Sequence, residues 1–319
     1  MLPMPISPQA PPFPDELPRV SLVTPCYNGM PWLRAAIDSV LGQDYPNLEY
    51  LVMDGGSTDG TVELLKEYGE QLTWVSAPDD GQADAIARGF ERTTGEILGW
   101  LNADDTLKPG AIRAAVEALQ AHPAAGLVYG QADFIDAEGR IIGPCTVVEP
   151  YSRQRLFYYG DYIIQPAAFF NRRAYAAAGG LDRSLHWAMD WDLWLRLARH
   201  HEVLYLDRKL ASYRWLGSNK TAAGGFDRLQ EVEAVARRHG CSGLPAYFRL
   251  EMARLLAERA GEELKRRHFL PMLGTLARAA AAIFTSWRAA ASLLSPHVWR
   301  NYRSARALYR YAAELDAAK

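Results

Sequence analysis

Cysteine is scarce in this chain of 319 residues, which has three: Cys26, Cys145 and Cys241. Their wide separation and odd number match neither a disulfide framework nor a zinc-binding pattern. We therefore expect a protein of a reducing compartment. Excess charge is also lacking, because 35 basic and 37 acidic residues leave a formal net charge of −2. This balance gives no support to nucleic-acid binding over the whole surface, although it permits a local basic patch.

Long hydrophobic runs are missing as well. No uninterrupted apolar stretch reaches the roughly 18 residues that a membrane-spanning helix needs. The first eighteen residues contain seven prolines and no basic segment followed by an apolar one, so we interpret 1–18 as a Pro-rich lead-in rather than a signal peptide. We expect a cytoplasmic protein, and attachment to a membrane surface stays open.

Strand and helix patterns alternate from Arg19 onward. Short apolar runs predict strands at 20–25, 48–54, 72–77, 96–102 and 126–130, whereas helical spacing predicts helices at about 32–41, 61–69, 82–95 and 109–122. Strands that alternate with helices build parallel βαβ units. We therefore predict an α/β protein with a doubly wound, mostly parallel sheet that is covered by helices on both faces.

The segments that follow the first four strands share a polar character. They read "TPCYNG", "MDGGSTDGT", "APDDGQAD" and "NADD". In sheets of this kind ligands bind beyond the carboxyl ends of the strands. Each segment alone is an ordinary turn, since Gly, Asn and Asp favour turns. Four in succession favour one shared ligand site over four independent turns.

The second half of the chain is more mixed. A hairpin is expected at 136–139, a helix at 189–201 and two short strands within 202–217. From about Phe226 the pattern is helical almost throughout. We find no internal repeat.

Six segments carry a resemblance to a known family. They are 20–61, the "DDGQADAIARGF" segment, "TGEILGWLNADD", "GGLD", "MDWDLWLRLA" and "YRWLGSNKT". In this order they resemble glycosyltransferase family 2, the inverting nucleotide-sugar transferases of the glycosyltransferase-A fold. The resemblance covers about residues 19–221. It implies a nucleotide-sugar-binding and catalytic domain over 19–225. The helical pattern and the basic composition predict a helical, basic C-terminal region over 226–319.

The resemblance also implies roles for individual residues. Those expected to bind the nucleotide-sugar donor are Thr24, Pro25, Tyr27, Asp54, Gly55, Gly56, Asp84, Arg88, Asn102 and Ala103. Asp54 would bind the base, and Asp84 and Arg88 would lie at the ribose and phosphate. Mn²⁺ or Mg²⁺ is the implied cofactor, with Asp104 and Asp105 as its expected ligands.

Two positions depart from the family pattern at the metal site. Asn102 replaces the first carboxylate of the Asp-x-Asp motif, which leaves a neutral oxygen there and shifts metal binding onto Asp104, helped by Asp105. Leu216 follows the Tyr-Arg pair where relatives often carry a histidine close to the metal. Both changes weaken the expected site.

Asp190 and Asp192 begin the helix at 189–201. Carboxylates at a helix N-terminus are favoured by the helix dipole, so both can be structural. The resemblance instead assigns Asp190 as the general base that takes the proton of the acceptor hydroxyl, and we expect Asp192 to be structural. Gln165 and Pro166 either shape the acceptor side or only the geometry of their loop.

Acidic residues are absent between Leu264 and Ala313. The same span has nine basic residues: Lys265, Arg266, Arg267, Arg278, Arg288, Arg300, Arg303, Arg306 and Arg310. Its aromatic residues are Phe269, Phe284, Trp287, Trp299, Tyr302, Tyr309 and Tyr311. The span is either a helical pair packed on the catalytic domain or an amphipathic surface for anionic lipid. Nucleic acid is the least favoured partner.

The resemblance implies an inverting glycosyltransferase that moves a sugar from a nucleotide-diphosphate sugar to a hydroxyl acceptor. The basic, aromatic tail suits a glycan or lipid-linked acceptor, as in cell-surface polysaccharide synthesis, and a peripheral position at the inner face of the cytoplasmic membrane. One alternative is a sugar-phosphate nucleotidyltransferase, although "TPCYNG" lacks the Gly-rich basic signature of that class. The other is a non-catalytic nucleotide-binding or membrane-associated scaffold, which Asn102 and Leu216 keep open.

Overall fold

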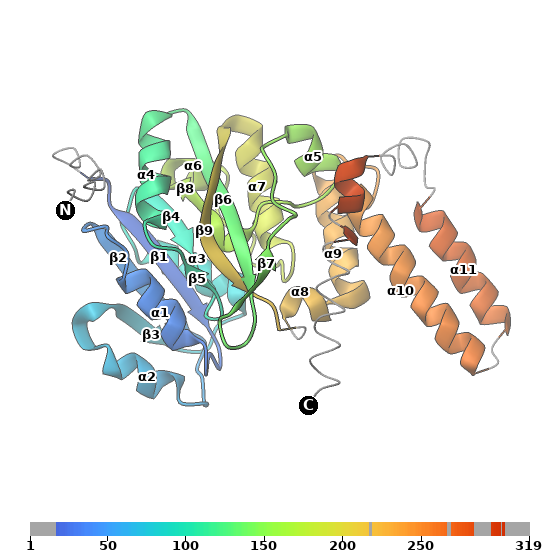
Figure 1. Cartoon of the computed structure of the whole chain (residues 1–319), viewed down its shortest axis with the longest axis horizontal. Helices are drawn as coiled ribbons and strands as arrows, with labels where there is room; N and C mark the ends of the chain where they lie inside the picture. The colour runs from blue at the N-terminus through green and yellow to red at the C-terminus, as the bar shows by residue number, and fades with distance from the viewer. Residues whose placement is uncertain (1–16, 217–218, 267–268, 284–294, 301, 304–319) are drawn as a thin grey trace, which may run out of the picture.

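The alternating pattern of the first hundred residues folds into parallel strands with helical connections (Figure 1). The computed structural model describes residues 17–216, 219–266, 269–283, 295–300 and 302–303. Its first elements are β1 (Val20–Cys26), α1 (Leu33–Leu41), β2 (Leu48–Asp54), α2 (Thr61–Glu67), a 3-10 turn (Gly69–Gln71), β3 (Thr73–Ser76), α3 (Gln82–Glu91) and β4 (Ile97–Trp100). Cys26 pairs in register with Asp54, and Asp54 with Ser76. The polar segments after these strands therefore meet at one edge of the sheet.

The second half of the chain extends the same sheet. It contributes β5 (Thr106–Leu107), α4 (Ala111–Ala121), β6 (Ala125–Ile135), β7 (Ile141–Pro144), α5 (Arg153–Tyr158), a 3-10 turn (Gln165–Ala167), β8 (Ala168–Asn171), α6 (Arg172–Ala177), α7 (Met189–His200) and β9 (Glu202–Arg214). The strand order is β3-β2-β1-β4-β8-β6-β9-β5, with β7 on β6 as the expected hairpin. Strands β1 to β4 pair in parallel and β8 joins β4 in the antiparallel sense. The predicted α/β class is confirmed.

One strand differs from its expectation. The segment predicted as two short strands is the single 13-residue strand β9, which runs parallel to β6. The pairing shifts register near Tyr129 and Gln131, opposite the polar sequence at 207–209. An irregularity of this kind accommodates an extra residue without ending the strand. The polar break in the sequence therefore marks a bulge and not a turn.

Helices cover both faces of the sheet, and the strand alternation divides the core accordingly. Leu22 of β1 belongs to one buried cluster, which includes side chains of α1, α2 and α4. Its neighbour Val23 belongs to the other, together with side chains of α3 and α7. At the centre of this second cluster Trp100 of β4 stacks on Trp194 of α7, with ring centroids 5.5 Å apart.

The remaining helices are α8 (Lys220–Ala223), α9 (Gly225–Arg238), α10 (Ala246–Lys265) and α11 (Phe269–Ile283). Helix α9 buries Leu229, Val232 and Val235 in the same cluster as α7. The boundary expected at residue 225 therefore does not separate two hydrophobic cores. Helices α10 and α11 lie side by side at the end of the molecule opposite β2 and β3 (Figure 1).

A short C-terminal segment packs back on the part of the chain that carries the sheet. The buried Glu149 carboxylate accepts a hydrogen bond from Arg300 at 2.5 Å and lies 2.6 Å from His297 Nδ1. Val298 is buried against Ala246 and Leu250 of α10. Within the described ranges no helix combines the length and the apolar character that a membrane span requires.

Several residues of the expected basic surface lie outside the described residues. They are Arg267, Phe284, Trp287, Arg288, Arg306, Tyr309, Arg310 and Tyr311, together with most of the Pro-rich lead-in.

Candidate active site

A cleft of about 850 Å³ opens at the carboxyl ends of β1, β2 and β4. It brings together residues from segments far apart in the sequence, as the four polar strand ends predicted. Of the residues assigned from the resemblance, those that line the cleft are Pro25, Tyr27, Gly55, Asn102, Ala103, Asp104 and Asp190. Thr24, Asp54, Gly56, Asp84, Arg88 and Asp105 are not among the lining residues.

The base end of the expected donor site is built by the segments after β2 and β3. A Cβ on Gly55 would lie 2.9 Å from Oδ2 of Asp79, so a larger residue would require that carboxylate to move. Gly56 follows with a φ of +86°, which L side chains rarely adopt. Asp79 lines the cleft and accepts a hydrogen bond from the Gly81 backbone N–H at 2.9 Å. It belongs to the polar "APDD" segment, although we did not single it out from the sequence.

Asp54 and Thr24 support this end from behind. The buried Asp54 carboxylate accepts hydrogen bonds from the Gly56 backbone at 3.2 Å, from the Ser76 hydroxyl at 2.6 Å and from Ser57. Thr24 Oγ1 is buried 3.0 Å from the Tyr50 hydroxyl. Asp54 therefore holds the glycine-rich loop in shape. Its predicted contact with the base stays a prediction.

Asp84 and Arg88 lie on α3 away from the cleft lining. The buried Asp84 carboxylate accepts from Arg88 at 3.3 Å and from Arg183 at 2.9 Å. Arg88 also donates to the Pro78 carbonyl at 3.2 Å. These contacts tie α3 to the segment before α7, and the predicted role of Asp84 and Arg88 in ribose and phosphate binding stays a prediction.

The "NADD" loop after β4 divides its polar groups between the cleft and the interior. Asp104 lines the cleft, and burial raises the pKa of its carboxyl. Asp105 is buried: its Oδ1 accepts from the Arg214 backbone N–H at 2.9 Å and its Oδ2 from the Asn102 amide at 3.2 Å. Asp105 thus anchors the loop to β9, and its predicted metal role stays a prediction.

The donor groups of this loop suit a divalent cation only in part. Among the described residues, no group of three or more His, Cys, Asp or Glu side chains is arranged to hold a metal. Asn102 Oδ1 already accepts from the Gln82 amide at 2.7 Å. Mg²⁺ sites at nucleotides commonly use one or two carboxylates and complete their ligand shell with phosphate oxygens and water. Asp104 fits such a site when a diphosphate supplies the remaining ligands.

Lys220 and Gln82 also line the cleft and were missed from the sequence. Lys220 Nζ donates to Gln82 Oε1 at 3.1 Å, and Gln82 in turn donates to Asn102. Burial lowers the pKa of Lys220 to about 8, against the opposing effect of Asp190 and Glu231. Lys220 is therefore mainly a cation at neutral pH. Lys220 belongs to the segment "YRWLGSNKT", which is one of those that carry the family resemblance, so the sequence could have indicated this residue.

Asp190 begins α7 on the far side of the cleft. Its Oδ1 accepts from the Trp191 backbone N–H at 2.8 Å, and burial raises the pKa of its carboxyl. Gln165 also lines the cleft and donates to the Trp100 carbonyl at 2.8 Å, whereas Pro166 is buried within its 3-10 turn. A carboxyl with a raised pKa at the edge of a ligand cleft suits a general base.

Asp192 has the structural position expected of it. The buried carboxylate accepts from Arg196 Nε at 2.8 Å and lies 2.8 Å from His239 Nε2. Burial opposes its ionisation, but the hydrogen bond with His239 and the charge of Arg196 outweigh burial and hold its pKa below the ordinary value. Asp192 thereby connects α7 to the end of α9.

Comparison with known proteins supports the sequence-based assignment. The family described as "Glycosyl transferase family 2" matches residues 21–179. An uncharacterised glycosyltransferase of Rickettsia typhi is 28% identical over 229 residues, which is 68% of this chain and 70% of the relative. A chondroitin synthase of Escherichia coli is 28% identical over 219 residues, 68% of this chain but 32% of that protein.

Solved structures show the same architecture. S. aureus TarS 1-349, in a complex with UDP-GlcNAc, superposes with a TM-score of 0.59 at 14% identity, covering 93% of this chain and 92% of that one. A Pyrobaculum calidifontis mannosyltransferase in complex with GDP-Man and Mn²⁺ gives 0.57 at 23% identity, covering 97% and 88%. With the matched segments and the shared sheet, this chain belongs to glycosyltransferase family 2 and has the glycosyltransferase-A fold.

Proposed function

We propose that the chain is an inverting glycosyltransferase that transfers a sugar from a nucleotide-diphosphate sugar to a hydroxyl of a glycan or lipid-linked acceptor. The observation that carries this proposal is the single cleft that Asp104 and Asp190 both line. One carboxylate lies at the strand ends where nucleotides bind in α/β sheets, and the other lies at the start of α7.

The donor fits the strand-end side of the cleft. Tyr27, Gly55 and Asp79 form the expected base end, and Lys220 offers a positive charge for the diphosphate. A bound Mg²⁺ or Mn²⁺ held by Asp104 would screen the phosphate charge and stabilise the departing diphosphate. Complexes of the structural neighbours with UDP-GlcNAc and with GDP-Man and Mn²⁺ support this donor class.

The reaction then follows from the position of Asp190. Its carboxylate accepts the proton of the acceptor hydroxyl while that oxygen forms a bond to the anomeric carbon. The bond from the anomeric carbon to the diphosphate oxygen breaks, and the electron pair leaves with the nucleotide diphosphate. A single displacement of this kind inverts the anomeric configuration.

The test first measures binding of the nucleotide-sugar donor. It then measures the slow hydrolysis of that donor in the absence of an acceptor. Thermal shift against UDP-, GDP- and dTDP-sugars, with and without Mn²⁺, should identify the base, because a ligand at 100 times its Kd adds about 2.7 kcal/mol of stability. The matched nucleotide sugar should then release nucleotide diphosphate in the wild type and not in Asp190→Asn. Binding without hydrolysis in either protein would favour the scaffold alternative, and release of pyrophosphate from a nucleoside triphosphate and a sugar phosphate would favour the nucleotidyltransferase.

We also propose that the protein attaches peripherally to an anionic membrane surface, as at the inner face of a cytoplasmic membrane. Leu270, Leu273 and Leu276 project from α11 with exposed fractions of 82%, 57% and 44%. Apolar residues on one helix, in a span with basic residues and no acidic ones, are typical of helices that lie in the headgroup region. Arg300 forms an ion pair with Glu149, which holds the C-terminal segment against the rest of the protein. We therefore do not assign Arg300 to lipid binding.

A further inference from the structure

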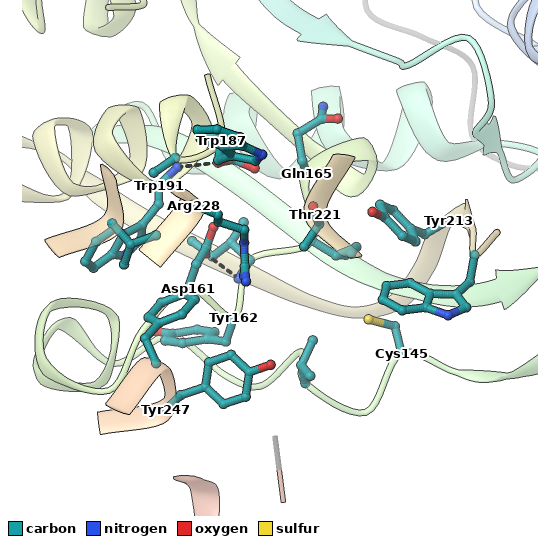
Figure 2. A pocket seen from close by; sticks show the side chains of 18 of the residues that line it. Cys145, Asp161, Tyr162, Gln165, Trp187, Trp191, Tyr213, Thr221, Arg228 and Tyr247 are labelled. Carbon is teal, nitrogen blue, oxygen red and sulfur yellow. Dashed lines mark hydrogen bonds between the residues drawn. The ribbon is translucent and has the colours of Figure 1, made fainter. Parts of the chain in front are cut away.

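A second, smaller cavity of about 190 Å³ lies beside Asp190 (Figure 2). Both cavities are lined by Gln165, Trp187, Asp190, Tyr213 and Thr221. Asp190 therefore lies where the large cleft meets the small cavity. A group held in the small cavity would reach the same carboxylate as a donor held in the cleft.

The walls of the small cavity are mainly aromatic. Tyr162, Trp187, Trp191, Tyr213 and Tyr247 surround it, as Figure 2 shows. At about 30 Å³ for each water, its volume corresponds to roughly six waters, which suits one small ring and not an extended chain. Rings with an apolar face and polar edges match walls that combine aromatic surfaces with a few polar groups.

Asp161 is a polar group of the cavity that takes no part in the proposed transfer reaction. Its Oδ1 accepts from the Ile163 backbone N–H at 3.0 Å. Burial and the nearby negative charge of Asp190 hold its pKa well above the ordinary value, so the carboxyl retains a proton more readily than a surface aspartate. A protonated carboxyl can donate a hydrogen bond to a hydroxyl oxygen.

Arg228, the arginine of the lining, opposes this rise in the pKa of Asp161 through its positive charge. Arg228 donates to both carboxylate oxygens of Glu251, at 2.9 and 3.0 Å, and stacks over Phe248 at 5.2 Å. These contacts tie Arg228 to α10. Asp161 and Asp190 both belong to the lining of the small cavity.

We propose that this cavity binds one sugar ring at the end of the acceptor, with Asp161 holding a hydroxyl beside the one that Asp190 deprotonates. The inference rests on the proposed transferase activity and adds the class of acceptor, a saccharide. The reacting hydroxyl gives its proton to Asp190 as above, and Asp161 takes part only through its hydrogen bond to the neighbouring hydroxyl. Asp161 is thus an acceptor-binding residue rather than a base.

The test uses simple sugars as probes, without the natural acceptor. Methyl α- and β-pyranosides of glucose, galactose, mannose and N-acetylglucosamine are titrated into the full-length protein by ligand-observed NMR, in the presence of UDP or GDP. We expect at least one glycoside to bind the wild type. Asp161→Ala should weaken it by roughly tenfold, the effect of about 1.4 kcal/mol, which is within the range of one hydrogen bond.

The matched variants separate binding from folding. Asp161→Asn keeps the shape and a neutral donor, so it should restore most of the affinity, and Asp44→Ala, an exposed carboxylate elsewhere, should change nothing. Nucleotide binding should be the same in all four proteins. Nucleotide binding with no glycoside bound, or equal glycoside affinity in the wild type and Asp161→Ala, would overturn this inference and leave the transferase proposal intact. Loss of nucleotide binding in the wild type itself would instead count against the transferase.

Discussion

The side-chain amide of Asn219 donates a hydrogen bond to Oδ2 of Asp104 at 3.3 Å and another to the Arg214 carbonyl at 2.9 Å. It therefore links the loop after β4 to the segment that follows β9. Asp104 is the only carboxylate of the "NADD" loop that lines the cleft, and Asn219, which is distant from it in the sequence, holds it in position. The first prediction concerns this carboxylate.

Asp104 and Asp105 should respond differently to removal. Asp104→Ala should lose most donor hydrolysis and its dependence on Mn²⁺ or Mg²⁺, and its melting temperature should stay near that of the wild type. Asp105→Ala should lose less activity but about 1 to 3 kcal/mol of stability, because the Arg214 N–H and the Asn102 amide lose their partner. Hydrolysis with EDTA and with added metal, together with thermal melting, checks both. Asp104→Ala fully active in EDTA would refute the metal assignment.

Asp190→Asn should separate catalysis from donor binding. The substitution keeps the size of the side chain and removes its ability to take a proton, so turnover should fall by roughly 10² to 10⁴. Affinity for the nucleotide sugar should hold within a few-fold. Steady-state kinetics beside direct titration of the nucleotide give the two quantities. A normal turnover for this variant would mean that another group acts as the base.

Asp192 should govern stability in acid rather than turnover. A carboxyl whose pKa is depressed in the folded state stabilises the fold above its unfolded pKa, and this stability is lost as pH falls through the folded value. With an ordinary value of 3.8, the loss should begin below about pH 4. Asp192→Asn should lower the unfolding free energy by about 1 to 3 kcal/mol at pH 7 and flatten its acid dependence. Urea unfolding at several pH values measures this, and an unchanged acid dependence would contradict it.

The exposed leucines of α11 should mediate vesicle binding. Leu270→Asp with Leu273→Asp should abolish co-sedimentation with anionic vesicles, since each change places a charge in the apolar contact and repels the lipid. Wild-type binding should be weak on neutral vesicles and fall with salt, because exposed charges are screened. Ile141→Asp, an equally exposed apolar position on β7, is the matched control. Unchanged binding of the double variant would show that α11 does not contact the membrane.

The sheet and the location of the site could be predicted from the sequence because both depend on periodicity. Buried strands with polar ends place β1 to β4 and their loops without knowledge of any contact. The single strand β9 could not be predicted, since a bulge and a turn share the same polar residues.

Individual roles were harder to predict than the place of the site. Asp54, Asp84 and Asp105 have the residue type of ligand-binding groups, yet neighbouring donors satisfy them in the interior. The sequence shows a carboxylate at a strand end but not which way its oxygens point. Asp79 and Asp161 were missed for the converse reason, because only the folded chain shows that they border the cavities.

The wall of the small cavity comes partly from α9 and α10, through Arg228, Val232, Tyr247 and Phe248. The base end of the large cleft, with Tyr27, Gly55 and Asp79, is built before residue 105. A chimera that exchanges these C-terminal helices with those of a relative could therefore change the acceptor and keep the nucleotide preference. Over evolutionary time, substitutions in the two helices offer a route to new acceptors that leaves the residues of the base end unchanged.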